Sequence, residues 1–285
     1  MGTVQSIDFP TYAKQHNLVL VDLVEKGLFT EEDFLVLQEL FGYLDGKKKL
    51  HNVLSNIPYV IKNLPVFVQD FDQIILNRLK DLKKFSADKS KPLREKYPIT
   101  DYIHKASIAA AAHPQNVLEI GTYYGWGAAS IKAACPDAAV YTMNPKENKD
   151  ANNPIDEELI GSVCRKKGLE VVQLWADSTQ FDFSTLPRMD VTYVDGNHSY
   201  DYVYKDLENV SKITNKMLLL DDYIPDKNSP RGDVRAWGPW NAEVVKAVND
   251  FVASHSAIIE SAYWIIGTPI CVIHLKKITP QNGAR

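Results

Sequence analysis

The sequence predicts an α/β fold with a mostly parallel sheet, and three observations lead to that prediction. From about residue 98 onward, short apolar runs alternate with amphipathic segments, which is typical of strands alternating with helices. A glycine-rich turn follows the first of these runs, and only Gly267-Thr268-Pro269 separates the last two. Such a short final connection predicts an antiparallel hairpin. The expected architecture is therefore a parallel sheet closed by a C-terminal hairpin.

The composition is that of a globular protein without a strong charge bias. The chain has 285 residues, of which 45% are hydrophobic and 24% charged, and its formal net charge is −4. The weak negative charge gives no electrostatic case for a nucleic-acid partner. No apolar run approaches the roughly 20 residues of a membrane span, and no cationic start with an apolar core predicts a secretion signal. We expect neither a nucleic-acid nor a membrane partner.

The chain has three cysteines, Cys135, Cys164 and Cys271. Their number is odd, and their spacing is not that of metal ligands. They are expected to be buried free thiols, as in a protein of the reducing cytoplasm.

The first 97 residues predict a separate helical unit. Thr30-Glu31-Glu32-Asp33 is a capping residue followed by an acidic first turn, and apolar residues then recur every three or four positions up to Leu44. A second such face runs from Phe71 to Leu82, and residues 83–98 are rich in Lys, Ser and Pro. We therefore expect a helical unit at 1–97, making lid, substrate or dimer contacts, and a sheet domain at 98–285.

The elements expected in the sheet domain follow from apolar period and length. Helices are expected at 99–112, 128–134, near 157–167, near 202–213 and at 241–255, with strands at 117–120, 140–143, 170–175, 190–195, 217–222, 259–266 and 270–276.

The turn after the first strand is the most informative motif. It reads E-x-G-x-x-x-G-x-G, with the acid at Glu119 and the glycines at Gly121, Gly125 and Gly127. Glycines let the backbone approach a ligand closely, and the following helix offers unpaired N–H groups. The spacing is not the G-x-G-x-x-G of dinucleotide-binding proteins, and no phosphate-binding loop occurs in the chain. These features predict a ligand cradle, although any α/β protein with a glycine-rich first turn would also match.

This motif resembles the first motif of class I S-adenosylmethionine-dependent methyltransferases. The resemblance implies a Rossmann-like sheet in which the turn, including Tyr123, wraps the methionine part of the cofactor. The C-terminal antiparallel hairpin is also a feature of that class.

Polar residues follow every strand of the predicted parallel part of the sheet. They are Asn144 after the second strand, Asp177-Ser178 after the third, Asp195 after the fourth and Asp221-Asp222 after the fifth. Ligands of open α/β sheets lie beyond the carboxyl ends of the strands. These residues are therefore candidates for a binding site, although each acid could instead cap a helix or turn.

A second resemblance is carried by Val194-Asp195-Gly196-Asn197-His198-Ser199-Tyr200 and Leu220-Asp221-Asp222-Tyr223. They are similar to the D-G-x-H-x-Y turn and paired acid of a subgroup of small-molecule O-methyltransferases. The resemblance covers about residues 98–277. It implies that Asp177 and Ser178 lie at the adenine, and that the residue ending the second strand binds the ribose. That residue is usually an acid, and Asn144 can still bond a hydroxyl but lacks the carboxylate's charge.

The acids Asp195, Asp221 and Asp222 are expected to meet, because their strands are neighbours in the family's sheet. Three carboxylates repel unless they are protonated or neutralised, and a divalent cation such as Mg²⁺ is the predicted partner. The alternative is that all three only order their turns. His198, a short turn after Asp195, is the candidate base for a substrate hydroxyl, and Asp195 its catalytic partner.

The long polar loop at 225–240 follows the fifth strand and contains Trp237 and Trp240. It is expected to be a lid or substrate wall, or else to anchor the helical unit.

Together these patterns predict a cytoplasmic enzyme that methylates a hydroxyl of a small molecule with S-adenosylmethionine, assisted by a divalent metal. A metal-independent N- or C-methyltransferase and a non-catalytic binding protein on the same fold are the alternatives. The glycine spacing disfavours a dinucleotide oxidoreductase. The expected partner is a hydroxylated small molecule, with a homodimer left open.

Overall fold

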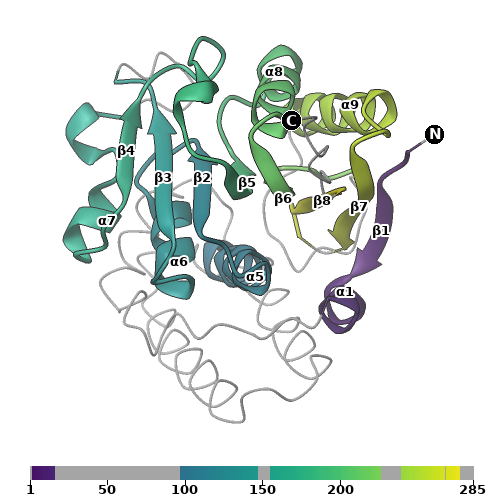
Figure 1. Ribbon diagram of the computed structural model, residues 1–285, viewed down its shortest axis with the longest axis horizontal. Coiled ribbons are helices and arrows are strands. Elements are labelled where there is room, and N and C mark those ends of the chain that lie inside the picture. Colours follow the sequence, from purple (N-terminus) through teal and green to yellow (C-terminus); the bar gives the residue numbers. More distant parts are fainter. Residues whose placement is uncertain (1, 17–96, 147–154, 226–238, 267, 277–285) are drawn as a thin grey trace, which may run out of the picture.

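The computed structural model describes residues 2–16, 97–146, 155–225, 239–266 and 268–276, and these form one eight-stranded sheet flanked by helices (Figure 1). The helical faces predicted between residues 30 and 82, and the connection after them up to residue 96, lie outside the described residues. So do residues 226–238 of the predicted loop over the site.

The bounds of the elements agree with most of the predicted positions to within a few residues. The helices are α1 (Phe9–Gln15), α5 (Tyr97–Ala111), α6 (Trp126–Ala134), α7 (Ser162–Lys166), α8 (Tyr200–Ser211) and α9 (Pro239–Ser254), with 3₁₀ turns at Glu157–Leu159 and Phe183–Thr185. The strands are β1 (Gln5–Asp8), β2 (Asn116–Ile120), β3 (Ala139–Asn144), β4 (Val172–Trp175), β5 (Met189–Val194), β6 (Thr214–Leu220), β7 (Ile259–Ile266) and β8 (Cys271–Leu275).

The topology confirms the predicted fold class, a mostly parallel Rossmann-like sheet closed by a C-terminal antiparallel hairpin. Its strand order is β1-β7-β8-β6-β5-β2-β3-β4. Strands β2 to β6 pair with one another in parallel, whereas β8 is antiparallel to both β6 and β7. Ile120, Val194 and Leu220 are in register at the ends of β2, β5 and β6. The turns after these three strands therefore leave one edge of the sheet side by side.

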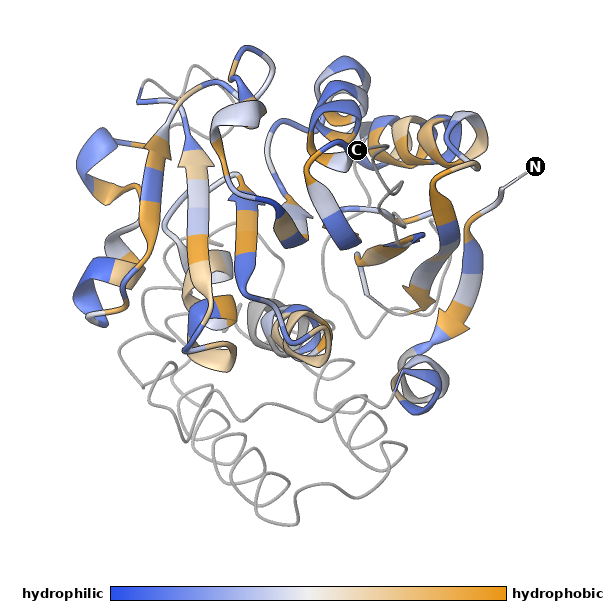
Figure 2. Ribbon diagram, in the orientation of Figure 1, coloured by the Kyte–Doolittle hydropathy of each residue, from blue (hydrophilic) through white to orange (hydrophobic). Residues whose placement is uncertain are grey.

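Two apolar layers cover the faces of the sheet, because alternate strand residues point to opposite sides. Val117 packs in a cluster with Ile108 of α5 and Ile131 of α6. Its neighbour Leu118 packs in a second cluster with Leu207 of α8 and Phe251 of α9. Figure 2 shows the hydrophobic residues along the strands and on the helix faces. This packing holds the strand ends in fixed positions.

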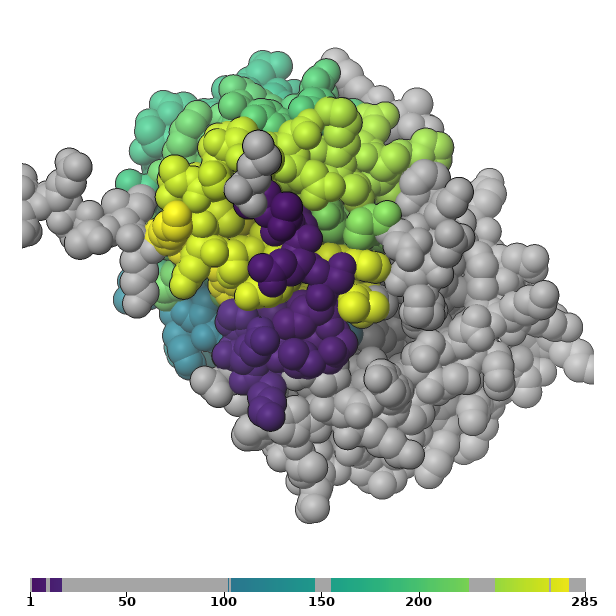
Figure 3. Space-filling model, turned by 90° about the vertical axis from the view of Figure 1, so that its right-hand side faces the viewer, coloured from purple at the N-terminus to yellow at the C-terminus, as the bar shows by residue number. Residues whose placement is uncertain are grey.

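The prediction of a wholly helical N-terminal segment is wrong for Gln5–Asp8, which form β1 and pair in parallel with β7. A strand of four mostly exposed residues is too short to produce a period-two apolar signal. Asp8 then caps α1, and Tyr12 of α1 is buried, with its hydroxyl 2.9 Å from His274 Nε2. Figure 3 shows this segment lying against the C-terminal strands. Residues 2–16 thus belong to the sheet domain, and the proposed boundary at residue 97 does not separate them from it.

A second difference lies between β3 and β4, where one helix was expected near 157–167. The structure has a 3₁₀ turn at Glu157–Leu159 and then α7, because Gly161 adopts the left-handed region with φ +69° and starts a new helix. The three cysteines are free and buried, as predicted. No helix within the described ranges is long and apolar enough to cross a membrane.

Candidate active site

The predicted cradle is formed by the turn between β2 and α6. Gly121, Tyr123 and Gly125 all have positive φ, at +98°, +46° and +90°. For Tyr123 this is an uncommon conformation, and such positions concentrate at functional sites. The N–H groups of Gly121 and Thr122 both donate to Met143 O, at 2.9 and 3.1 Å. The turn is therefore fixed to the end of β3.

The glycines of the cradle are required by contacts within the protein. A Cβ on Gly121 would overlap the backbone oxygen of Asp195, and one on Gly127 would overlap the carboxylate of Glu119. From the sequence we expected Gly121 to let the backbone approach a ligand closely. The structure adds a second reason for a glycine, since a Cβ would meet the turn after β5. The cradle and the Asp195 turn are thus in direct backbone contact.

Glu119 lies beneath the cradle and is buried. Its Oε2 accepts a hydrogen bond from the Thr142 hydroxyl at 2.5 Å, and the N–H of Ala128 in the first turn of α6 also bonds it. Burial raises the pKa of Glu119 to about 8, against the lowering effect of these hydrogen bonds. Glu119 therefore holds the start of α6, and its direct contact with a cofactor stays a prediction.

The residues predicted for the ribose and adenine have their own contacts in the turns. Asn144 Oδ1 accepts from the Tyr123 N–H at 3.3 Å, and its Nδ2 donates to Pro145 O at 2.9 Å. Asp177 Oδ1 accepts from the N–H and the hydroxyl of Thr179, at 2.9 and 2.7 Å. This is the turn-capping role considered as the alternative for Asp177. Contacts of Asn144, Asp177 and the buried Ser178 with a cofactor stay predictions.

Asp206 of α8, which with Leu207 also belongs to the stretch that carries the family resemblance, lies behind this part of the site. It is fully buried, and a Cβ on Gly196 would lie 3.7 Å from its Oδ2. Among the described residues, neither of its carboxyl oxygens has a partner in hydrogen-bond geometry. Burial raises the pKa of Asp206 to about 7, although the nearby Ser178 hydroxyl lowers it by a smaller amount.

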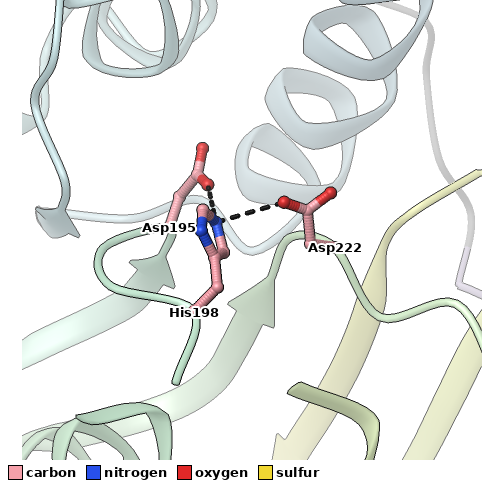
Figure 4. A group of neighbouring side chains, drawn as sticks. All are labelled: Asp195, His198 and Asp222. Carbon is pink, nitrogen blue, oxygen red and sulfur yellow. Dashed lines mark ion pairs between the residues drawn. The ribbon is translucent and has the colours of Figure 1, made fainter. Parts of the chain in front are cut away.

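Asp195, His198 and Asp222 face one another on the other side of the cradle (Figure 4). His198 Nε2 lies 3.1 Å from Asp222 Oδ2 and 3.7 Å from Asp195 Oδ1. The side chains of Asp195 and His198 are about one quarter exposed, and that of Asp222 is 8% exposed. Each offers one ligand atom, and these atoms lie within 4.8 Å of one another. The group is therefore partly exposed at two of its side chains and compact enough to hold a cation.

The charge of His198 is set by the two carboxylates. Burial alone would lower its pKa, but Asp195 and Asp222 outweigh that effect and raise the pKa to about 10. At neutral pH the imidazole is consequently protonated, and it supplies the positive charge between the two acids.

Asp221, the third acid of the expected trio, lies near Asp195 but has a cation of its own. Asp221 Oδ2 lies 2.7 Å from Lys105 Nζ, and both side chains are about 2% exposed or less. The premise that the acids lack a positive partner is therefore wrong for Asp221. Lys105 is in α5, 116 residues away in the chain. In the sequence it is one polar residue among several in a helix rich in Ala and Ile, which did not suggest a role.

Asp222 is held in a left-handed conformation, with φ +54°. Its N–H donates to Asp221 Oδ1 at 2.9 Å, and its C=O accepts from Asn241 Nδ2 of α9 at 2.8 Å. Such a backbone conformation is costly for Asp and persists only where the surroundings impose it. The two acids thus have different roles, because Asp221 is bonded inward and Asp222 faces His198.

Trp240, at the start of α9, is 45% exposed.

Comparisons with known proteins agree with this fold. Residues 118–223 match the family model described as a methyltransferase domain. No curated protein sequence matches the chain. It is similar to the SAH-bound Podospora anserina methyltransferase PaMTH1, with 17% identity, covering 75% of this chain and 98% of that one, and a TM-score of 0.45. It is also similar to the O-methyltransferase from Bacillus cereus in complex with SAH, with 16% identity, covering 86% of this chain and 99% of that one, and a TM-score of 0.46. For MycE in complex with Mg, SAH and mycinamycin VI the identity is 13%, the match covers 60% of this chain and 47% of that one, and the TM-score is 0.39.

Proposed function

We propose that the protein is a class I methyltransferase that uses S-adenosylmethionine to methylate a hydroxyl oxygen of a small molecule. The match of residues 118–223 to a methyltransferase-domain model supports the first part of this proposal. The observation that supports an oxygen acceptor is the group of Asp195, His198 and Asp222 beside the cradle. Asp195 is next to the cradle through its backbone, which touches Gly121 and donates from its N–H to Ile120 O at 2.8 Å. An acceptor held by this group would lie next to the cofactor.

The reaction requires a proton to leave the acceptor. S-adenosylmethionine supplies the methyl group on a positively charged sulfur. An alcohol or phenol is a poor nucleophile until its proton is removed, whereas an uncharged amine needs no such help. His198, held between two carboxylates, is placed to take up that proton once its own proton has been displaced. The arrangement therefore favours an oxygen acceptor over a nitrogen acceptor.

The same group fits a divalent cation by its donor chemistry. Carboxylate oxygens of Asp195 and Asp222 are ligands that Mg²⁺ accepts, and an imidazole nitrogen suits Mn²⁺ or Zn²⁺ better. When bound, such a cation would lower the pKa of an acceptor hydroxyl and orient its oxygen. The cation would replace the proton of His198 as the positive charge between the acids, which leaves the imidazole free to accept a proton. We include a divalent cation at Asp195 and Asp222 in the proposal, and exclude Asp221 from the ligand set.

The proposal is tested on the full chain, treated with chelator and then given S-adenosylmethionine and a panel of catechols, sugars and amines. Formation of S-adenosylhomocysteine is measured with and without Mg²⁺ or Mn²⁺. We expect product from hydroxylated acceptors only, restored by the cation, and no binding of NAD in calorimetry. Asp222→Asn should lower the rate on the order of 10²–10³-fold, because it removes charge stabilisation at the reacting group. Asp137→Asn, at an exposed position, is the control and should have no effect.

Each alternative has its own outcome in this experiment. Undiminished transfer to a hydroxyl in chelated buffer would refute the role of the cation while leaving O-methylation intact. Product from amines alone would indicate N-methylation. Binding of S-adenosylhomocysteine without turnover on any acceptor would favour a non-catalytic protein.

A further inference from the structure

Lys105 is the centre of a buried polar network that the reaction proposed above does not use. Its Nζ lies 2.7 Å from Asp221 Oδ2 and 2.5 Å from the Tyr193 hydroxyl oxygen. The ammonium also lies over the ring of Tyr193, 4.7 Å from its centroid. Lys105 is 1% exposed and Tyr193 is fully buried. A lysine is almost never buried this completely without partners, so the network fixes its position.

Tyr193 carries the effect of Lys105 to Asp195. Its hydroxyl lies 2.5 Å from Asp195 Oδ2 and 3.0 Å from Asp221 Oδ2. A tyrosine hydroxyl has one proton to donate and can accept from the ammonium at the same time. With Lys105 donating to its oxygen, the proton is directed to Asp195 at the shorter distance. Asp195 Oδ2 is thereby held inside, and Oδ1 is the oxygen turned toward His198.

Asp221 carries the effect of Lys105 to Asp222. Its Oδ2 is bonded to Lys105 and its Oδ1 accepts from the Asp222 N–H. That N–H belongs to the residue with positive φ whose Oδ2 faces His198. One carboxylate oxygen of Asp221 is thus held by Lys105, and the other holds the backbone of Asp222. Through Asp221, the ammonium of Lys105 therefore fixes the position of Asp222.

We propose that Lys105 and Tyr193 are a positioning pair that aims the carboxylates of Asp195 and Asp222 at their common ligand. The inference rests on the proposed function, because it names which residues prepare that same site. Neither member of the pair touches the acceptor. Groups that orient metal-binding or catalytic side chains typically change affinity or activity by about 10–100-fold when removed.

Tyr193→Phe is the sharpest test, since it removes the hydroxyl and leaves the ring and the Lys105–Asp221 ion pair in place. The probe is Mn²⁺ alone, titrated by calorimetry into the full chain. We expect the affinity for Mn²⁺ to fall about tenfold or more, while the affinity for S-adenosylhomocysteine stays within about twofold because the ring beside Gly127 remains. Tyr223→Phe is the matched control. Tyr223 is equally buried, follows Asp222 directly, and donates to Asn249 Oδ1 at 2.8 Å instead.

A second variant tests Lys105 without changing the net charge. Lys105→Met/Asp221→Asn replaces the ion pair by neutral groups, and the asparagine oxygen can still accept from the Asp222 N–H. Because Lys105→Met alone would leave a buried carboxylate unpaired, the double variant is the one expected to fold. We expect its Mn²⁺ affinity to fall by a similar factor to that of Tyr193→Phe. Unchanged Mn²⁺ affinity in folded Tyr193→Phe would overturn the proposal.

The positioning pair can be judged even if the proposed cation is wrong. Should the unmodified protein bind no Mn²⁺, the metal part of the proposed function fails, and the His198 imidazole signals in NMR become the measure. Those signals are assigned by their loss in His198→Gln. A shift in Tyr193→Phe but not in Tyr223→Phe then supports the pair, and unmoved signals in both refute it.

Discussion

The two sides of the site are built in different ways. On the proposed cofactor side, the cradle is one continuous segment from β2 to α6, and its glycines, turn and helix start are neighbours in the chain. On the proposed acceptor side, the strand ends of β5 and β6 meet an ammonium from α5, which is 116 residues from the acid that it binds. A local motif thus makes one half of the site, whereas tertiary packing makes the other.

That difference explains what could be read from the sequence. The cradle was predicted because glycine spacing reports on local backbone conformation. The meeting of Asp195 with Asp222 followed from strand order, which alternation and the family resemblance both supply. Lys105 could not be found in this way, because a lysine within a helix gives no indication of what it faces after folding. Strand β1 was not predicted for a related reason. It is an edge strand of four residues whose partner lies 258 residues further on in the chain, as in Gln5 opposite Tyr263.

The largest change in stability is expected at Gly121, where the cradle and the Asp195 turn touch. In Gly121→Val the Cβ would overlap the Asp195 backbone, and the residue would also be held at a φ of +98°. We expect a loss of more than about 4 kcal/mol in the free energy of unfolding, the range of severe single substitutions. Thermal unfolding is the measurement, with Gly168→Ala as the control, because Gly168 also has positive φ but open space around it.

The result at Gly121 separates two explanations. A folded Gly121→Val protein with a normal melting temperature and no binding of S-adenosylhomocysteine would mean that the glycine serves the ligand. Loss of stability together with loss of binding would mean that it joins the two turns, as the structure indicates.

A smaller effect is expected from Asp206, which lies behind the turns after β4 and β5. Its pKa of about 7 in the folded state exceeds the ordinary value of 3.8, so the folded protein binds the proton more tightly. The free energy of unfolding is then reduced as pH rises between these values, and the contribution present below pH 3.8 is lost above pH 7. Asp206→Asn carries no charge to bury and should escape this loss, which amounts to at most about 4 kcal/mol.

Urea unfolding at pH 5, 6, 7 and 8 measures this difference. The advantage of Asp206→Asn over the unmodified protein should grow up to about pH 7 and then level off. Asp137→Asn, at an exposed position, should show no such trend. A constant difference at all four pH values would show that the Asp206 carboxylate finds a partner when it ionises.

The smallest effect, on the rate of methyl transfer, is expected at His198. Its size shows whether the proposed acceptor side works through its acids or through its imidazole. With the cation bound, the acids and the cation together already favour loss of the acceptor proton, so the imidazole is one of several groups that assist. His198→Gln should therefore reduce methyl transfer only about tenfold in saturating Mg²⁺ or Mn²⁺, well short of the loss in Asp222→Asn. Its affinity for S-adenosylhomocysteine should be unchanged, since His198 lies on the acceptor side. If His198→Gln is as inactive as Asp222→Asn while S-adenosylhomocysteine still binds, the imidazole is the essential base and the acids serve chiefly to hold it. If binding of S-adenosylhomocysteine is lost as well, the two sides are not separable, because the turn after β5 then has to be intact for the cradle to close.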